Sequence, residues 1–180
     1  MTDAITQVAT RLVYENRWLR LREDRVRRLD GSEGIYSVLE RADFAVICPY
    51  QDGRVFLVEQ FRYPVGERAW EFPMGTWEWQ ADVDPKALAA GELREETGLQ
   101  AAELTQIGEL FQAAGYSNQR GRVFFATGLT EGAAEREPEE QDMRRASFTL
   151  AEVETMIRSG VIRDAITIAA FAQARLHGLV

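Results

Sequence analysis

The chain of 180 residues carries its clearest structural signal in the stretch Asp84-Pro-Lys-Ala-Leu-Ala-Ala-Gly-Glu-Leu-Arg-Glu-Glu-Thr-Gly-Leu99. Asp84 is a good N-cap residue, and Pro85 suits the first helical position, where its missing N–H costs nothing. Residues that favour helix follow, and Gly98 can supply the left-handed conformation that ends a helix. The stretch therefore predicts a helix from about residue 85 to residue 97.

Segments of alternating or continuous apolar character on both sides of this helix predict strands. Turn residues separate them at 30–34 in the N-terminal part and at 51–53 within a hairpin. The expected strands are 11–13, 18–28, 34–40, 45–49, 54–60, 69–72, 103–111, 122–126 and 147–150, with loops at 113–118 and 131–141 and helices near 151–160 and 164–176. This order indicates an α/β/α sandwich around a mixed sheet, preceded by an antiparallel β appendage.

The composition narrows the chemistry that the chain can support. A net charge of −8 argues against a nucleic-acid binder that works through a basic face. Cys48 is the sole cysteine and His177, near the C-terminus, the sole histidine, which argues against a disulfide, a thiolate zinc site or a histidine-dependent triad. Carboxylates are therefore the expected acid–base and metal-binding groups. The chain has no apolar run of membrane-spanning length and no signal-peptide pattern at its start, so we expect a cytoplasmic protein with no membrane partner.

Three glutamates mark the expected central helix. Glu92, Glu95 and Glu96 stand at positions i, i+3 and i+4, which share one helical face. Like charges so close repel, and a hard cation such as Mg²⁺ or Mn²⁺ would stabilise them, because such ions prefer carboxylate oxygens. The spacing alone leaves open a solvated acidic face beside Arg94.

In its wider context this cluster resembles the box of the Nudix family, G-x5-E-x7-R-E-U-x-E-E-x-G-U, where U is aliphatic. Residues 92–99 match the second half at every specified position, and Gly75 opens the segment. The positions of the box arginine and the first box glutamate hold Gly91 and Val83, and the loop after Gly75 is two residues longer than usual. Asp82 could replace the missing acid, whereas Asp84 is explained as the helix cap.

The flanking segments resemble the ADP-ribose and ADP-sugar pyrophosphatase branch of this family. The similar stretches are 18–41, 59–65, 70–75 and 160–170. The resemblance implies a homodimer whose N-terminal strands help to build the partner's substrate site. Residues 1–41 are accordingly expected to serve dimerisation and base binding, and residues 42–180 to form the Nudix hydrolase domain.

The resemblance also implies roles for residues that would bind substrate. Trp18 and Tyr36 match aromatic residues that sandwich the nucleobase, for which a flat ring is suited; packing within a dimer interface is the alternative. Arg41 and Arg62 match arginines near the diphosphate, whose oxygens a guanidinium can bind in bidentate fashion. An ordinary surface position is the alternative for either arginine.

A metal site is implied at the predicted helix. It would combine Glu92 and Glu96 with Glu95 nearby and the backbone carbonyl of Met74, and Mg²⁺ or Mn²⁺ is the expected cofactor. Such ions would neutralise the diphosphate and activate water.

The general base is implied to lie in a loop after the box. The matching residue is Glu139, with Glu140 and Asp142 as rivals and the box residue Glu95 as the next candidate. A flexible acidic loop with no role is the alternative.

The implied reaction is divalent-metal-dependent hydrolysis of a nucleoside diphosphate sugar, foremost ADP-ribose, to a nucleoside monophosphate and a sugar phosphate. A second hypothesis, motivated by Gly91 and Val83, is a non-catalytic or weakly active Nudix module that binds nucleotide sugars. A third is a Nudix enzyme that acts on nucleoside triphosphates or dinucleoside polyphosphates.

Overall fold

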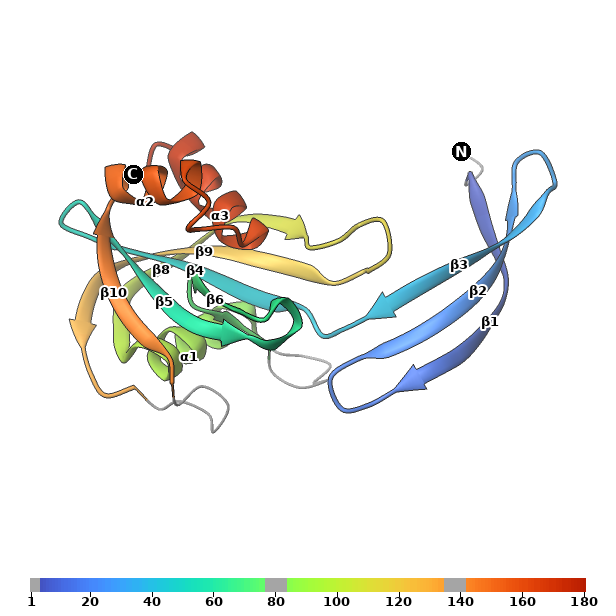
Figure 1. The fold of residues 1–180 in the computed structure, drawn as a ribbon, viewed down its shortest axis with the longest axis horizontal. Helices are drawn as coiled ribbons and strands as arrows, with labels where there is room; N and C mark the ends of the chain where they lie inside the picture. The colour runs from blue at the N-terminus through green and yellow to red at the C-terminus, as the bar shows by residue number, and fades with distance from the viewer. Residues whose placement is uncertain (1–3, 77–83, 135–141) are drawn as a thin grey trace.

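The computed structural model describes residues 4–76, 84–134 and 142–180, and these form a larger α/β domain and a long β arm (Figure 1). In the arm, β1 (Ile5–Glu15), β2 (Arg20–Arg28) and β3 (Glu33–Glu40) pair in that order as an antiparallel sheet. This is the expected N-terminal appendage. No helix in the described ranges is long and apolar enough to cross a membrane.

The domain is built on a mixed sheet. Its elements in chain order are β4 (Phe44–Gln51), β5 (Arg54–Arg62), the short 3-10 helix η1 (Tyr63–Val65), β6 (Glu67–Glu71), β7 (Met74–Gly75), α1 (Pro85–Thr97), β8 (Leu99–Phe111), β9 (Arg120–Glu131), β10 (Arg144–Thr149), α2 (Leu150–Arg158) and α3 (Ala165–Leu176). The main strand order is β10-β5-β4-β9-β8, with β6 beside β5 and β7 beside β4. The central pair β4 and β9 is parallel, and the other pairs are antiparallel.

Helices cover both faces of this sheet, and the side chains of strand β4 pack alternately against the helices on the two faces. Val46 and Cys48 pack in the cluster that includes α3, whereas Ala45 and Ile47 pack in the cluster that includes α1. Successive side chains of a strand point to opposite faces, so a strand buried on both faces is apolar at every position. The α/β/α sandwich expected from the sequence is confirmed.

Local signals set the bounds of α1 as expected. The Asp84 carboxylate accepts a hydrogen bond from the Lys86 N–H at 3.0 Å, and Pro85 begins the helix. Gly98 ends it with φ 74°, donating its N–H to the Arg94 carbonyl.

The predicted hairpin between β4 and β5 is also present. Asp52 and Gly53 both have positive φ values, 51° and 78°. Two such residues are typical of a tight turn whose twist matches that of the flanking strands.

Several strands are longer than the sequence indicated. We expected 103–111 and 122–126, but β8 begins earlier, at Leu99, and β9 extends further at both ends; the two strands pair along almost their whole length. The first strand was expected at 11–13 and instead covers Ile5–Glu15, paired with β2. Backbone pairing with a neighbour extends a strand beyond the part that its own pattern marks, because each added residue gains ladder hydrogen bonds.

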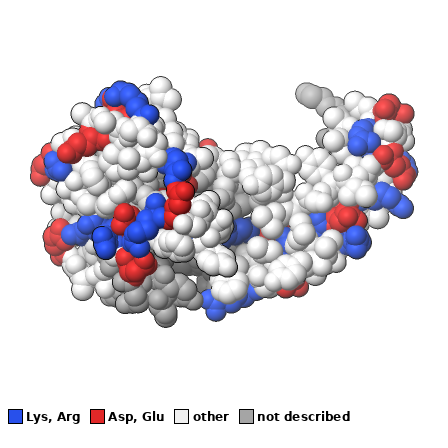
Figure 2. Space-filling model, viewed as in Figure 1, with Lys and Arg blue, Asp and Glu red and all other residues white. Residues whose placement is uncertain are grey.

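The arm joins the domain through its last strand. The Leu39 N–H donates to the Tyr116 carbonyl at 2.7 Å, and the Tyr36 hydroxyl donates to the Gly115 carbonyl at 3.1 Å. Most of the arm faces solvent, and its visible face carries broad uncharged areas (Figure 2). Its exposed large hydrophobic residues are Ile5, Val8, Leu12, Val13, Tyr14, Trp18, Leu29, Ile35 and Tyr36.

Candidate active site

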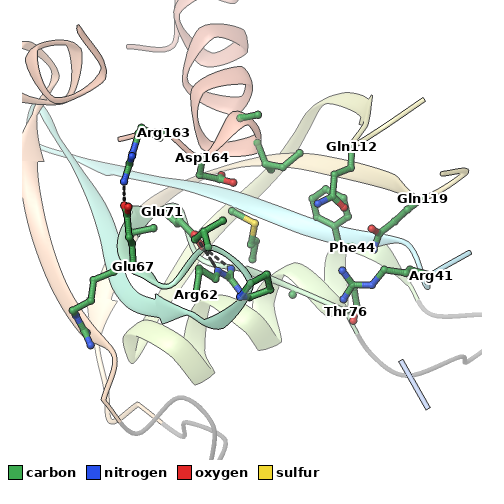
Figure 3. Close-up of a pocket in the computed structure, with 18 of the residues that line it drawn as sticks. Arg41, Phe44, Arg62, Glu67, Glu71, Thr76, Gln112, Gln119, Arg163 and Asp164 are labelled. Carbon is green, nitrogen blue, oxygen red and sulfur yellow. Dashed lines mark hydrogen bonds and ion pairs between the residues drawn. The ribbon is translucent and has the colours of Figure 1, made fainter. Parts of the chain in front are cut away.

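A pocket of about 580 Å³ opens where the β5–β6 connection, the end of β7, the loop before β9 and the start of α3 meet. Figure 3 shows Arg41, Gln112 and Gln119 at one end of the pocket, Arg62 and Glu71 in the middle with Asp164 above them, and Glu67 and Arg163 at the other end.

Arginines outnumber acids among the described residues that line this pocket, whereas acids outnumber basic residues in the whole chain. Among the described residues that line it are four arginines, Arg41, Arg62, Arg68 and Arg163, and three acids, Glu67, Glu71 and Asp164. The chain as a whole carries a net charge of −8. A concave site with a local excess of guanidinium groups favours an anionic ligand such as a diphosphate.

Arg62 is held in the middle of the pocket by Glu71. The Arg62 Nε lies 3.0 Å from each carboxylate oxygen of Glu71, which is only 3% exposed (Figure 3). Burial acts to lower the pKa of Arg62, but the hydrogen bonds and charge of Glu71, with the charges of Glu96 and Asp164, outweigh it and raise that pKa. Arg62 is therefore a fixed, permanently charged group, positioned to meet an anion.

Gly75 at the end of β7 makes room for the box glutamate Glu92. A β-carbon placed on Gly75 would lie 2.3 Å from Oε2 and 2.5 Å from Cδ of Glu92, so only glycine permits this approach. Glu92 is buried, and Glu96, one turn further along α1, is 1% exposed. Each carboxylate lies near a residue that lines the pocket: Glu92 packs against Gly75, and Glu96 is close enough to Arg62 for its charge to help raise the pKa of that guanidinium.

The three box glutamates do not converge on one point. Glu95 accepts a hydrogen bond from the neighbouring Arg94 at 3.3 Å. In the ranges that the structure describes, no three His, Cys, Asp or Glu residues are grouped closely enough to hold a metal ion. The donors available around Gly75 are nonetheless carboxylate and carbonyl oxygens, Met74 among them, and such donors suit Mg²⁺ or Mn²⁺. The metal site remains a prediction.

The two predicted phosphate-binding arginines line the same pocket. Arg41 follows the arm and Arg62 ends β5, and the fold brings both to one cavity. Gln119 lies beside Arg41, where its side chain donates to the Ala42 carbonyl at 2.6 Å.

The predicted base-binding aromatics lie on the arm and do not line the pocket of their own chain. Trp18 sits in the β1–β2 connection, is 55% exposed, and has the Arg17 guanidinium 4.4 Å above its ring. Tyr36 is 41% exposed and bonded through its hydroxyl to Gly115. Their stacking role remains a prediction.

Glu139, the predicted general base, and its rival Glu140 lie outside the described residues. The other rival, Asp142, is described: its carboxylate is bonded to Arg68, a pocket residue.

The sequence did not single out Glu71 or Asp164 as site residues. A signal for Glu71 was present, since it is an acid between Trp70 and Phe72 in an otherwise apolar strand end. Asp164 has the ordinary pattern of a helix cap, and only the packing of α3 shows that it faces a cavity.

Comparisons with known proteins agree with this architecture. Residues 5–39 match the model of the nucleoside diphosphate sugar hydrolase N-terminal domain, and residues 39–171 match that of the NUDIX domain. The chain is 37% identical over 151 residues to an ADP-ribose pyrophosphatase of Mycobacterium tuberculosis, covering 83% of this chain and 72% of that protein. It is 31% identical over 124 residues to an ADP-ribose pyrophosphatase of Bacillus subtilis, covering 68% and 66%.

Two further relatives extend the match to nearly the full chain. A methanol dehydrogenase activator of Bacillus methanolicus is 26% identical over 173 residues, covering 94% of this chain and 92% of that protein. A crystal structure of an ADP compounds hydrolase superposes with a TM-score of 0.85 at 18% identity, covering 97% of this chain and 94% of that one.

The fold is an α/β/α sandwich in which α1, the helix that carries the box glutamates, packs against Gly75 at the end of β7. The match to the NUDIX domain model covers most of the chain. The protein belongs to the Nudix family. It is a hydrolase of that family, and its resemblance to the ADP-ribose pyrophosphatase branch is confirmed.

Proposed function

We propose that the protein hydrolyses the diphosphate of a nucleoside diphosphate sugar, foremost ADP-ribose, to a nucleoside monophosphate and a sugar phosphate. The observation that carries this proposal is the pocket, which brings Arg41 and Arg62 (Figure 3) to the same cavity as Gly75, the strand end that packs against Glu92. The relatives named as ADP-ribose pyrophosphatases support the choice of substrate.

Arg41 and Arg62 would bind the oxygens of the diphosphate. Glu71 fixes the plane of the Arg62 guanidinium, so this side chain is already ordered, and loses little further conformational entropy, when substrate binds. In the reaction, the oxygen of a water molecule forms a bond to one phosphorus atom, and the bond from that phosphorus to the bridging oxygen breaks. Glu139 would take the proton of the attacking water, a role that rests on the family resemblance alone.

Glu92, Glu96 and the Met74 carbonyl would hold Mg²⁺ or Mn²⁺, with Glu95 nearby. The close contact between Glu92 and Gly75 supports this assignment, because it brings a carboxylate next to the pocket-lining end of β7. When bound, such ions supply charge neutralisation of the diphosphate and activation of water.

The arm, within residues 1–41, would dimerise the protein and contribute Trp18 and Tyr36 to the binding of a nucleobase, with residues 42–180 as the hydrolase domain. The exposed apolar side chains along β1 and β3 support this, since large exposed apolar areas mark interaction sites. A homodimer would bring one arm to the partner's pocket, which the arm of the same chain does not line with these aromatics.

A binding module with little or no catalysis is the second candidate. Gly91, buried in α1, occupies the place of the box arginine, so no guanidinium can act from that position. Such a module would bind nucleotide sugars with little turnover.

A panel of nucleotide sugars, nucleoside triphosphates and dinucleoside polyphosphates, assayed with Mg²⁺ and with Mn²⁺, tests the proposal. We expect the highest kcat/KM for ADP-ribose. Tight binding without turnover would favour the module, and preference for a triphosphate would overturn the substrate assignment.

A further inference from the structure

The end of the pocket farthest from Arg41 is formed by the start of α3 and by β6. Arg163 reaches it from the α2–α3 connection and Glu67 from β6, and Asp164 lies beside it at the start of α3, above Arg62 and Glu71 (Figure 3). An ion pair between Arg163 and Glu67 joins these two walls. Apolar side chains of Val65 and Val161 also line the pocket and are exposed to it.

Asp164 is held rigidly at this end. Its Oδ2 accepts the N–H of Thr167 at 2.7 Å and so caps α3. Thr167 is fully buried, and its hydroxyl accepts the N–H of Phe72 at 3.0 Å, which ties the first turn of α3 to the end of β6. A carboxylate offers about four acceptor positions, so this cap leaves acceptor capacity on the half-buried side chain that lines the cavity.

The negative charge of Asp164 is not needed for the cap. Ser and Asn cap helices about as well as Asp does. The charge instead lies close enough to Arg62 to help raise the pKa of that guanidinium. A carboxylate near a phosphate-binding arginine repels the phosphate, and a hydrogen bond from a donor group of the ligand to Asp164 would offset this repulsion.

We propose that Asp164 is a specificity-determining residue that accepts hydrogen bonds from hydroxyl groups of the sugar on the distal phosphate. This rests on the proposed function. With the diphosphate on Arg41 and Arg62, the group beyond Arg62 reaches the α3 end of the pocket. There Asp164 meets the hydroxyl face of a sugar, and Val65 and Val161 flank its C–H face.

The test compares two substrates of equal charge: ADP-ribose, and the methyl ester of ADP, in which a methyl group replaces the sugar. The variants Asp164→Ser and Asp164→Asn keep a residue that can cap α3 and remove the carboxylate. Asp84→Ser is the matched control, because it makes the same change at the cap of α1, outside the pocket lining.

We expect both Asp164 variants to lower kcat/KM for ADP-ribose by about 10- to 100-fold, the effect of losing hydrogen bonds to a charged group. They should leave kcat/KM for the methyl ester within about twofold of wild type, whereas Asp84→Ser should not alter the ratio between the two substrates. An equal loss on both substrates, or no loss on either, overturns the proposal. If the wild-type protein hydrolyses neither compound, the proposed function itself is refuted. If the wild-type protein is active but the Asp164 variants keep its preference between the two substrates, only the role of Asp164 is refuted.

Discussion

The substitution Gly75→Ala is expected to displace the Glu92 carboxylate while the protein still folds. The β-carbon would lie 2.3 Å from Oε2 of Glu92, whereas real β-carbons do not approach other atoms within 3.0 Å. The carboxylate must therefore retreat by about 0.7 Å. The obstacle is the end of a flexible side chain, so the chain can fold, but Glu92 leaves its place beside the end of β7.

This displacement is large for a metal ligand. Metal–ligand distances hold within about 0.2 Å, and Mg²⁺ demands near-ideal geometry. Loss of groups that orient a ligand weakens metal affinity by about 10- to 100-fold. We expect the Mg²⁺ concentration for half-maximal hydrolysis of ADP-ribose to rise by that factor in Gly75→Ala, and direct Mn²⁺ binding, followed by electron paramagnetic resonance, to weaken in parallel.

Gly108→Ala provides the control. Its β-carbon would lie 2.0 Å from Oε1 of Gln173, so it crowds the end of a flexible side chain to a similar degree, but that side chain belongs to α3. The control should lose some thermal stability and keep the wild-type Mg²⁺ requirement. An unchanged Mg²⁺ requirement in Gly75→Ala would refute the assignment of Glu92 as a ligand.

Four further outcomes are expected. Glu96→Gln should abolish turnover of the best substrate, and a wild-type rate would show that the metal assignment is wrong. Glu139→Gln should lower kcat by about 10²- to 10⁴-fold while leaving KM nearly unchanged, because a general base acts in the chemical step; full kcat there together with a loss in Glu140→Gln would move the role to the neighbour. The protein should sediment as a dimer at micromolar concentration, whereas a clean monomer would also weaken the stacking roles on the arm. Burial raises the pKa of the Cys48 thiol, so a thiol reagent at pH 8 should modify it only after denaturant is added, and rapid labelling of the native protein would contradict its burial.

The sequence indicated those features that depend on neighbours within a few residues. The N-cap at Asp84, the left-handed Gly98 and the turn at Asp52 and Gly53 were all predicted and are present. The apolar run of β4 likewise predicted a strand, which the structure shows to be buried on both faces. The box spacing and the flanking segments indicated the family, because they preserve the residue types that its fold and chemistry need. The start of β8 and both ends of β1 and β9 were missed, because they depend on a partner strand.

Contacts between segments that lie far apart in the chain were decided only by the tertiary structure. The sequence offered Arg41 and Arg62 as phosphate ligands by resemblance, but the sheet order and the arm connection bring them to one pocket. It showed Gly75 as the start of a box, and only the packing of α1 on β7 shows that its missing side chain is the space that Glu92 fills. Asp164 had the pattern of a helix cap and nothing more, because local capping chemistry is the same on any helix; its place in the pocket follows from how α3 lies across the sheet, which no local pattern encodes.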